Sequence, residues 1–139
     1  MFPITMASSE PIRVLFVDDN ESFCQVAKLS LESKSMRVDT VRNGRFAMNL
    51  LLSKTYDVVV SDYVMPDLDG INLLKRVRLV DAHIPFILLT GTDMGVSAEA
   101  INAGANAFVH KGQDGKFFFD ELSKKILRAV EKARETPKK

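Results

Sequence analysis

Apolar residues along the chain form five short runs, which are separated by longer segments with the apolar spacing of a helix. The short runs cover residues 12–17, 36–41, 57–61, 85–89 and 106–109, and their lengths are typical of strands. In the third and fourth runs the apolar residues are consecutive, as in central parallel strands that helices cover on both faces. The pattern therefore predicts strands alternating with helices around one parallel sheet.

The segments between these strands carry residues that start and end helices. Asn20 or Asp19 can cap a helix after the first strand, because a side-chain oxygen there accepts hydrogen bonds from the free amides of the first turn. Gly104 suits the left-handed residue that ends the fourth helix. The remaining helices are expected after Asn43-Gly44, over about 70–79 and over about 116–134.

Three of these helices have an apolar side that we expect to face the sheet. In the last helix, Phe117 lies roughly opposite Leu122 on the helical wheel and points away from that side. The residues expected on the apolar sides are Phe23, Val26, Ala27, Leu29, Ser30 and Leu31 in the first helix, Phe46, Ala47, Leu50 and Leu51 in the second, and Phe118, Phe119, Leu122, Ile126, Ala129 and Val130 in the last.

The size and composition of the chain suit one domain with its own core. The chain has 139 residues, of which 46% are hydrophobic. We expect the domain to cover residues 11–134, between flexible tails at 1–10 and 135–139. The formal net charge is +1, and acidic and basic residues are interspersed. Because no broad basic face is expected, the sequence argues against direct binding of nucleic acid.

The cysteine content and the first residues bear on the compartment. Cys24 is the only cysteine and cannot form an internal disulfide, so we expect it to pack inside the domain. Residues 1–10 lack the cationic and apolar pattern of a secretory signal, and no later segment reaches the length of a membrane span. We therefore expect a cytoplasmic protein that does not enter a membrane.

Three carboxylates follow two of the predicted strands. Asp18 and Asp19 come directly after the first strand, and Asp62 comes directly after the third. Because the carboxyl ends of parallel strands open on one crevice, these acids would lie close together and repel one another. A hard divalent cation would relieve that repulsion, so this crevice is the candidate functional site.

Two more strand ends add a hydroxyl and an ammonium group. The fourth strand leads into Thr90-Gly91, and the fifth leads into Lys111. Acids, a hydroxyl and an ammonium group at one edge indicate phosphoryl chemistry. In an extended strand His110 points to the face opposite Lys111, so we expect His110, like His83 in its polar turn, to have a structural or surface role.

These strand-end residues belong to a longer series of motifs, which runs through nearly the whole chain. The series comprises Asp18-Asp19, Asp62, Met65-Pro66-Asp67-Leu68-Asp69-Gly70, Thr90-Gly91, Ala103-Gly104-Ala105, Phe108 and Lys111. In this order and at about this spacing, the motifs resemble the receiver domain of two-component response regulators. The resemblance implies a flavodoxin-like, doubly wound α/β fold of five strand-helix units. Its parallel sheet would have the strand order 2-1-3-4-5, with a ligand crevice between the first and third strands.

The resemblance also implies a role for each acid. Asp62 would be the phosphoacceptor, which takes a phosphoryl group from the phosphohistidine of a histidine kinase or phosphotransfer domain and becomes an acyl phosphate. Asp62 and Asp19 would bind Mg²⁺ directly, and Asp18 would bind it through water. The carbonyl oxygen of Val64 would complete the ligands that the protein supplies.

The same resemblance implies phosphoryl-binding and switch residues. Lys111 and the Thr90 hydroxyl would contact the phosphoryl oxygens. The backbone amides of Tyr63 and Gly91 would donate further hydrogen bonds to them. Thr90 would then move toward the phosphoryl group while the ring of Phe108 rotates inward. The surface of the fourth helix, fifth strand and fifth helix would change with them and bind an unknown downstream protein or a second copy of the chain.

Some positions depart from the family pattern. Gly112 follows Lys111 where the family usually has proline, so a cis peptide bond there would lack its usual support. Phe108 lacks the hydroxyl of the common tyrosine, so a signal would pass through the position and packing of its ring. Val64 and Thr92 lie where the family tunes its dephosphorylation, and apolar Val64 would not orient water. The sequence therefore predicts slow loss of the phosphoryl group.

Other functions stay open beside a phosphorylation-controlled signalling domain, which would promote only its own phosphorylation and dephosphorylation and is not otherwise an enzyme. A Mg²⁺-dependent aspartyl phosphatase usually has a second acid two residues after the nucleophile, where this chain has Val64. An interaction module that keeps the fold without being phosphorylated is compatible with the Lys111-Gly112 junction. The loop 65–70 is expected to shape a turn and to start the third helix, without a catalytic role.

Overall fold

A computed structural model describes residues 10–91, 95–112 and 114–135. Strands and helices alternate along these residues, as the hydrophobic pattern predicts. The strands are β1 (Arg13–Val17), β2 (Arg37–Val41), β3 (Val58–Asp62), β4 (Phe86–Thr90) and β5 (Ala107–His110). The helices are α2 (Glu21–Glu32), α3 (Gly44–Ser53), α4 (Gly70–Val80), α5 (Val96–Ala103) and α6 (Gly115–Glu135).

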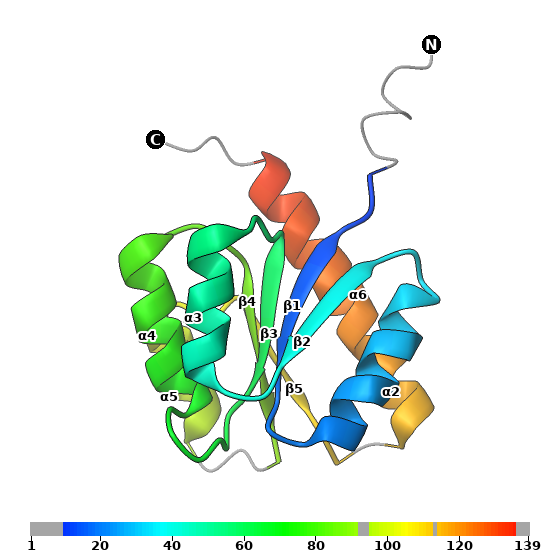
Figure 1. The fold of residues 1–139 in the computed structure, drawn as a ribbon, viewed down its shortest axis with the longest axis horizontal. Coiled ribbons are helices and arrows are strands. Elements are labelled where there is room, and N and C mark those ends of the chain that lie inside the picture. The colour runs from blue at the N-terminus through cyan, green and yellow to red at the C-terminus, as the bar shows by residue number, and fades with distance from the viewer. Residues whose placement is uncertain (1–9, 92–94, 113, 136–139) are drawn as a thin grey trace.

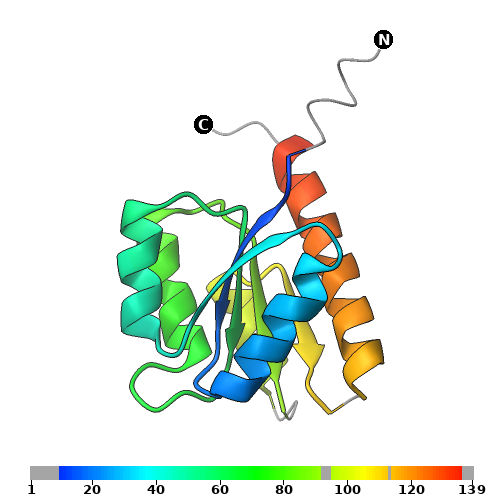
Figure 2. The same ribbon diagram turned by 45° about the vertical axis from the view of Figure 1, so that its right-hand side comes forward.

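The five strands form one parallel sheet between two layers of helices (Figure 1). The strand order is β2-β1-β3-β4-β5, which confirms the predicted doubly wound order. Helices α2 and α6 cover one face of the sheet, and α3, α4 and α5 cover the other, as the turned view also shows (Figure 2). Because all strands are parallel, their carboxyl ends meet at one end of the sheet and their amino ends at the other.

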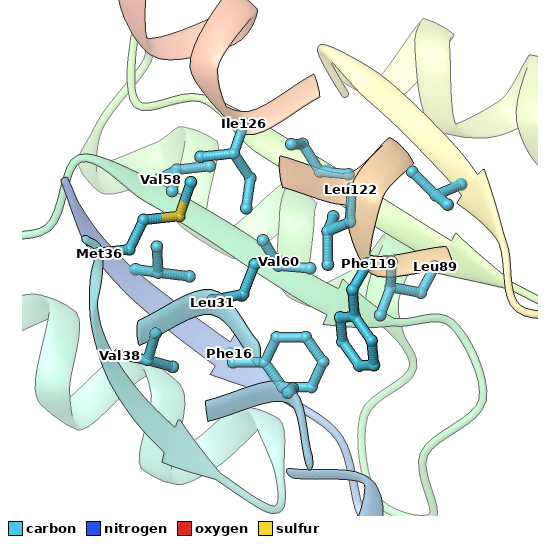
Figure 3. Close-up of a cluster of buried hydrophobic side chains, with 14 of the residues drawn as sticks. Phe16, Leu31, Met36, Val38, Val58, Val60, Leu89, Phe119, Leu122 and Ile126 are labelled. Atoms are coloured by element: carbon cyan, nitrogen blue, oxygen red, sulfur yellow. The ribbon is translucent and has the colours of Figure 1, made fainter. Parts of the chain in front are cut away.

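Each face of the sheet has its own apolar core, because successive strand residues point to opposite faces. In β1, Val14 and Phe16 pack toward α2 and α6, whereas Leu15 and Val17 pack toward α3, α4 and α5. The core on the α2 and α6 side is the one drawn in Figure 3. All five residues of β3 and of β4 are buried, in agreement with the consecutive apolar residues of these central strands.

The predicted helix ends are confirmed at several positions. Asn20, and not Asp19, caps α2, and its side-chain oxygen accepts the amide of Phe23 at 2.9 Å. Asn43 caps α3 in the same way. Gly104 ends α5 with φ +107°, a left-handed conformation that side chains other than hydrogen disfavour.

Two of the predicted apolar helix sides need correction. In α2, Val26 is 50% exposed and Leu29 72% exposed. The helix lies on the sheet along Cys24, Ala27 and Leu31, so only Ala27 and Leu31 of the predicted side are fully buried. In α3, Phe46 is 57% exposed. The small residues Gly44 and Ala47 are the buried ones in that helix, and a Cβ atom at Gly44 would lie 2.7 Å from Leu68. The close approach at Gly44 turns Phe46 outward.

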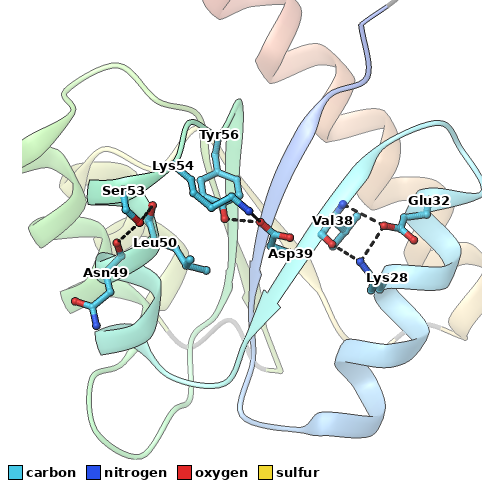
Figure 4. A network of polar contacts seen from close by, with 9 residues as sticks. All are labelled: Lys28, Glu32, Val38, Asp39, Asn49, Leu50, Ser53, Lys54 and Tyr56. Atoms are coloured by element: carbon cyan, nitrogen blue, oxygen red, sulfur yellow. Dashed lines mark hydrogen bonds and ion pairs between the residues drawn. The ribbon is translucent and has the colours of Figure 1, made fainter.

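Polar contacts tie the edge strand β2 to its neighbours (Figure 4). On one side Lys28 of α2 donates a hydrogen bond to the Val38 carbonyl oxygen at 2.6 Å and pairs with Glu32 at 3.0 Å. On the other side the Tyr56 hydroxyl and the Lys54 ammonium group donate to Asp39 at 2.6 and 2.7 Å. These contacts fix β2 against α2 and against the start of β3.

Some predictions concern residues outside those that the structure describes. They concern most of the two expected tails, at 1–9 and 136–139, and Thr92. Glu135 is the last residue of α6 and was expected in the C-terminal tail. In the part of the chain that the structure describes, no helix has both the length and the apolar character needed to cross a membrane.

Candidate functional site

The carboxyl ends of β1 and β3 bring the three predicted acids together. The two strands are neighbours in the sheet, with Val17 opposite Ser61, so Asp18 and Asp19 emerge beside Asp62. One carboxylate oxygen from each acid lies within 4.8 Å of the others. The three acids therefore lie close together, as predicted from the strand ends.

This arrangement of donors fits Mg²⁺. Two ligands on opposite sides of that ion lie about 4.2 Å apart, and these carboxylate oxygens all lie within 4.8 Å of one another. The three groups are hard oxygen donors, and Asp19 is exposed while Asp18 and Asp62 are buried. Val64, whose carbonyl oxygen was predicted as a further ligand, follows at the mouth of the crevice and is 67% exposed.

Lys111 holds the two buried acids. Its Nζ atom donates a hydrogen bond to Asp18 at 3.0 Å and lies 3.4 Å from Asp62. The backbone fixes its place, since the amide of Lys111 donates to the Thr90 carbonyl oxygen at 2.8 Å. The ammonium group also lies 4.5 Å from the centre of the Phe23 ring. Sequence reasoning missed this role of Phe23 because the residue also fits the apolar side of α2.

The electrostatics of the crevice follow from burial. Burial and the neighbouring charge of Asp18 raise the pKa of Asp62 to about 6, although Lys111 opposes the shift. Burial alone would lower the pKa of Lys111, but the hydrogen bond to Asp18 and the charges of Asp62 and Asp18 raise it. The crevice thus carries more negative charge than its one lysine neutralises, and a second cation would stabilise ionised Asp62.

The Thr90 hydroxyl stands out among the polar groups of the described residues. Thr90 is fully buried, and its Oγ1 atom is the only buried side-chain oxygen or nitrogen there without a hydrogen-bond partner. A buried hydroxyl without a partner is unfavourable, so this atom is ready to bond a group that enters the crevice. Gly91 follows it on the surface, and nothing lies within 4 Å of the place of its missing Cβ atom.

The amide of Tyr63 is already engaged. It donates a hydrogen bond to the Leu89 carbonyl oxygen at 2.8 Å, which continues the pairing of β3 with β4. The structure therefore does not offer this amide to a phosphoryl group, and the predicted contact needs correction. The cause is that the pairing of β3 with β4 continues as far as Tyr63, which could not be predicted from the sequence.

The loop after β3 is fixed close to Asp62. The amide of Gly70 donates to the Tyr63 carbonyl oxygen at 2.9 Å, and Asp69 caps α4 by accepting the Asn72 amide at 2.8 Å. A Cβ atom at Gly70 would lie 2.5 Å from the Asp62 carbonyl oxygen. The predicted structural role of this loop is confirmed, and Gly70 is the residue that lets α4 start against the backbone of Asp62.

Phe108 lies on β5, away from the acids. Its ring is partly buried against the core under α3, α4 and α5. Lys125 of α6 donates a hydrogen bond to the Phe108 carbonyl oxygen at 2.9 Å, and its Nζ atom lies 5.8 Å from the ring centre. His110 packs edge-on to the same ring at 6.5 Å. No cis peptide bond occurs among the described residues, and the Lys111-Gly112 bond is trans.

Cys24 takes no part in the chemistry of the crevice. It is buried, as predicted, and its thiol donates to the Asp18 carbonyl oxygen at 3.2 Å. Burial and the Asp18 charge raise the pKa of Cys24 to about 11, which keeps the thiol protonated and unreactive.

Comparisons with known proteins agree with this fold. The sequence model of the family described as "Response regulator receiver domain" matches residues 14–125. The chain is 30% identical to the transcriptional regulatory protein ZraR of Klebsiella oxytoca, over 88% of this chain and 27% of that protein. It is 32% identical to the regulatory protein AtoC of Escherichia coli, over 86% of this chain and 25% of that protein. It therefore spans about a quarter of the length of these relatives.

Solved structures agree as well. The receiver domain of the Francisella response regulator 1452 superposes with a TM-score of 0.79 at 29% identity, over 87% of this chain and 98% of that one. The chemotaxis response regulator CheY4 of Vibrio cholerae superposes with a TM-score of 0.73 at 25% identity, over 88% and 98% of the two chains.

Proposed function

The chain belongs to the response regulator receiver family, and we propose that it is a signalling switch controlled by phosphorylation of Asp62. One observation carries the proposal, namely the convergence of Asp18, Asp19 and Asp62 at one end of the sheet. Lys111 joins this cluster at 3.0 Å from Asp18, and the unpartnered Thr90 hydroxyl is buried at the end of the neighbouring strand. No single motif predicts all of these groups in one place.

In the proposed reaction, a carboxylate oxygen of Asp62 attacks the phosphorus atom of a phosphohistidine. A phosphorus–oxygen bond forms and the phosphorus–nitrogen bond breaks, so that the imidazole keeps the electron pair and takes a proton from solvent. The product is an acyl phosphate on Asp62. The donor would be a histidine kinase or a phosphotransfer domain.

The acids that would hold Mg²⁺ are Asp19 and Asp62 directly and Asp18 through water, with the Val64 carbonyl oxygen as a further ligand. The ion would supply positive charge between the carboxylates and the phosphoryl oxygens. Asp62 is the nucleophile, and burial keeps it in place at the end of β3. With its pKa at about 6, Asp62 is mostly ionised at neutral pH even before a metal binds.

The remaining groups would bind the transferred phosphoryl group. Lys111 would contact an oxygen without leaving its place, because it already lies 3.4 Å from Asp62. The Thr90 hydroxyl and the Gly91 amide would donate the other hydrogen bonds. The Tyr63 amide is left out of this set because Leu89 already accepts its hydrogen bond.

The signal would leave through α5, β5 and α6. Thr90 ends β4, which pairs with β5 and places Thr90 opposite His110. A movement of Thr90 toward a phosphoryl group would open space beside the partly buried ring of Phe108. The face would then bind a downstream protein or a second copy of the chain. Phe117, which is 66% exposed at the start of α6, would be a contact on this face.

Phosphorylation by a small donor tests the proposal. Incubation with Mg²⁺ and acetyl phosphate should add one phosphoryl group, seen by intact mass, which is stable in acid and labile in base. Asp62→Asn should remove the label completely. Asp67→Asn is the matched control, because Asp67 is an exposed acid in the adjoining loop. A label that persists in Asp62→Asn would contradict the site.

The same samples separate the alternatives. An interaction module would acquire no label, and an aspartyl phosphatase would hydrolyse small phosphoesters continuously. Val64 carries no group that orients water, so the label should decay slowly in a timed chase. With saturating beryllofluoride and Mg²⁺, amide NMR signals near Thr90 and Phe108 should shift. Unchanged signals there would leave the switch without a mechanism.

A further inference from the structure

A second site lies at the opposite end of the sheet from Asp62. A cavity of about 620 Å³ opens between the end of α4, the turn after α5, the start of β5 and the C-terminal half of α6. Ala107, which lines it, is the first residue of β5, whereas Asp62 is the last residue of β3. Because the strands are parallel, the cavity is at the amino end of the sheet. Its volume is in the range of small-molecule sites.

The inner wall of the cavity carries a fixed positive charge. Arg78 is half-buried, and its guanidinium group donates to the carbonyl oxygens of Asp81, Ile84 and Gly104 at 2.7–3.3 Å. It also donates to the side-chain oxygen of Asn106 at 3.1 Å. These partners are neutral, and no described carboxylate forms an ion pair with Arg78. Burial lowers the pKa of Arg78, although the nearby charge of Asp81 opposes this shift, so the site keeps an arginine charge that burial disfavours.

Helix α6 adds three cations on the side that faces Arg78. Lys125, Arg128 and Lys132 all line the cavity, because residues three and four apart share one side of a helix. Lys125 also forms an ion pair with Glu121, at 3.3 Å. Arg128 is exposed and has no polar partner among the described residues, so its charge is available to a ligand.

Positive charge is concentrated around the cavity, although the chain as a whole is nearly neutral. The net charge of the chain is +1, yet four permanent cations and no carboxylate line this cavity. Asp81 lies nearby, but its side chain accepts the amides of His83 and Ile84 at 2.8 and 2.9 Å. Four alanines, Ala82, Ala107, Ala129 and Ala133, complete an apolar part of the lining. Small side chains there leave room for a ligand against the helix and the strand.

We propose that this cavity binds a small soluble phosphate ester of about nucleotide size. Its phosphate group would lie between Arg128 and Lys132, because these two cations line the cavity and are exposed to solvent. Its apolar or planar body would lie on the alanines, over the guanidinium plane of Arg78. All hydrogen-bond donors of Arg78 are engaged within the protein, so Arg78 would act through its charge and its flat face.

NMR titration of the full chain with adenosine monophosphate tests the proposal. The titration is done in EDTA, so that no metal bridges the nucleotide to the acidic crevice. Amide signals of Gly104, Asn106, Ala107 and of α6 from 125 to 133 should shift, and the affinity should fall as salt is added. Adenosine, which lacks the phosphate, should leave these signals in place at the same concentration.

A paired substitution makes the test specific. Arg128→Ala with Lys132→Ala should weaken binding of adenosine monophosphate by about tenfold or more. The matched control is Lys116→Ala with Lys124→Ala, which removes the same charge from exposed positions of α6 outside the cavity and should keep the affinity within about twofold. Both variants should unfold in urea at about the same midpoint as the unsubstituted chain, which shows without any phosphorylation that they fold.

Two results would overturn the proposal. One is the absence of shifts around the cavity with adenosine monophosphate. The other is equal weakening by the cavity pair and the control pair, which would mean that only the overall charge attracts the nucleotide. Neither result bears on phosphorylation of Asp62, so the two proposals fail separately.

Discussion

The two ends of the sheet hold their charges in opposite ways. At the carboxyl end, Lys111 contacts two buried carboxylates directly, at 3.0 and 3.4 Å, and negative charge is still in excess. At the amino end, Arg78 is held by neutral oxygens, and four cations but no carboxylate line the cavity beside it. The proposed ligands follow this difference, since a cation from solution would suit the carboxyl end and a phosphate ester the amino end.

This contrast shows what a parallel sheet does for chemistry. Residues that follow the strands gather at one end, and residues that precede them gather at the other, however far apart they are in sequence. At the carboxyl end the gathered residues are ion-paired with one another, so their energies are coupled. At the amino end, Arg78 is held by backbone carbonyl oxygens and by the side chain of Asn106. Substitutions should therefore act differently at the two ends.

The largest effect is expected for Lys111→Met in the absence of metal. It leaves Asp18, whose side chain is 1% exposed, and Asp62 without their cation, which should lower the free energy of unfolding by about 3 kcal/mol. Mg²⁺ should restore part of this loss, because the ion replaces the missing charge. Urea unfolding with and without Mg²⁺ measures both. Lys116→Met, at an exposed position, is the control, and a loss no larger than the control's would show that the crevice charges are not coupled.

A somewhat smaller effect is expected for Gly70→Ala. The new Cβ atom would lie 2.5 Å from the Asp62 carbonyl oxygen and 2.6 Å from Leu88, so backbone must move, at about 2–3 kcal/mol of stability. The displaced strand end should also slow labelling by acetyl phosphate. Gly115→Ala is the control, since nothing lies within 4 Å of its Cβ position. Equal stability of the two variants in urea would mean that α4 does not depend on Gly70.

Asp62→Asn should stabilise the metal-free protein at neutral pH. The pKa of Asp62 is about 6 in the folded protein and 3.8 ordinarily, so between these values the folded state holds a proton that the unfolded chain has lost. Stability therefore falls as pH rises through this window, and asparagine escapes the loss. The advantage should reach at most about 3 kcal/mol above pH 6 and vanish below about pH 4.

Urea unfolding across this pH range measures that advantage. Asp67→Asn, in the exposed part of the adjoining loop, should show no comparable gain. An advantage of Asp62→Asn that is the same at low and neutral pH would contradict a charge effect and point to packing.

The smallest effect is expected at the amino end. Arg78→Lys keeps the charge but loses the planar set of donors that reaches Ile84 and Gly104 together, which should lower the stability by about 1–2 kcal/mol. Unlike the loss in Lys111→Met, this loss should be the same with and without Mg²⁺. Arg128→Lys, at an exposed position without polar partners, is the control. If Mg²⁺ reversed the loss of stability in Arg78→Lys, the two ends of the sheet would be energetically coupled, contrary to this prediction.

Much of the fold could be predicted because the signals are local. Consecutive apolar residues in β3 and β4 predict buried central strands, and Asn20 and Asn43 predict helix starts. The exposed residues Val26 and Phe46 could not be predicted in the same way. Which side of a helix faces the sheet depends on where small residues allow close approach, and that is decided by packing.

The candidate site likewise has some features that local sequence predicts and others that depend on packing. The acids and Lys111 follow strands and so could be placed at one edge from the sequence. The engaged amide of Tyr63 and the ring of Phe23 over Lys111 depend on pairing and side-chain direction. The cations of the cavity come from α4 and α6 and share no motif, so the interspersed charges along the chain did not indicate it.

The solitary Thr90 hydroxyl has a kinetic consequence. Turning the Tyr56 hydroxyl would break its 2.6 Å hydrogen bond to Asp39, but turning Thr90 about its χ1 angle breaks none. The activation barrier to that rotation is therefore set by steric packing alone. In the proposed switch, the first movement of Thr90 would therefore be limited by the side chains packed around it and not by a hydrogen bond that must break.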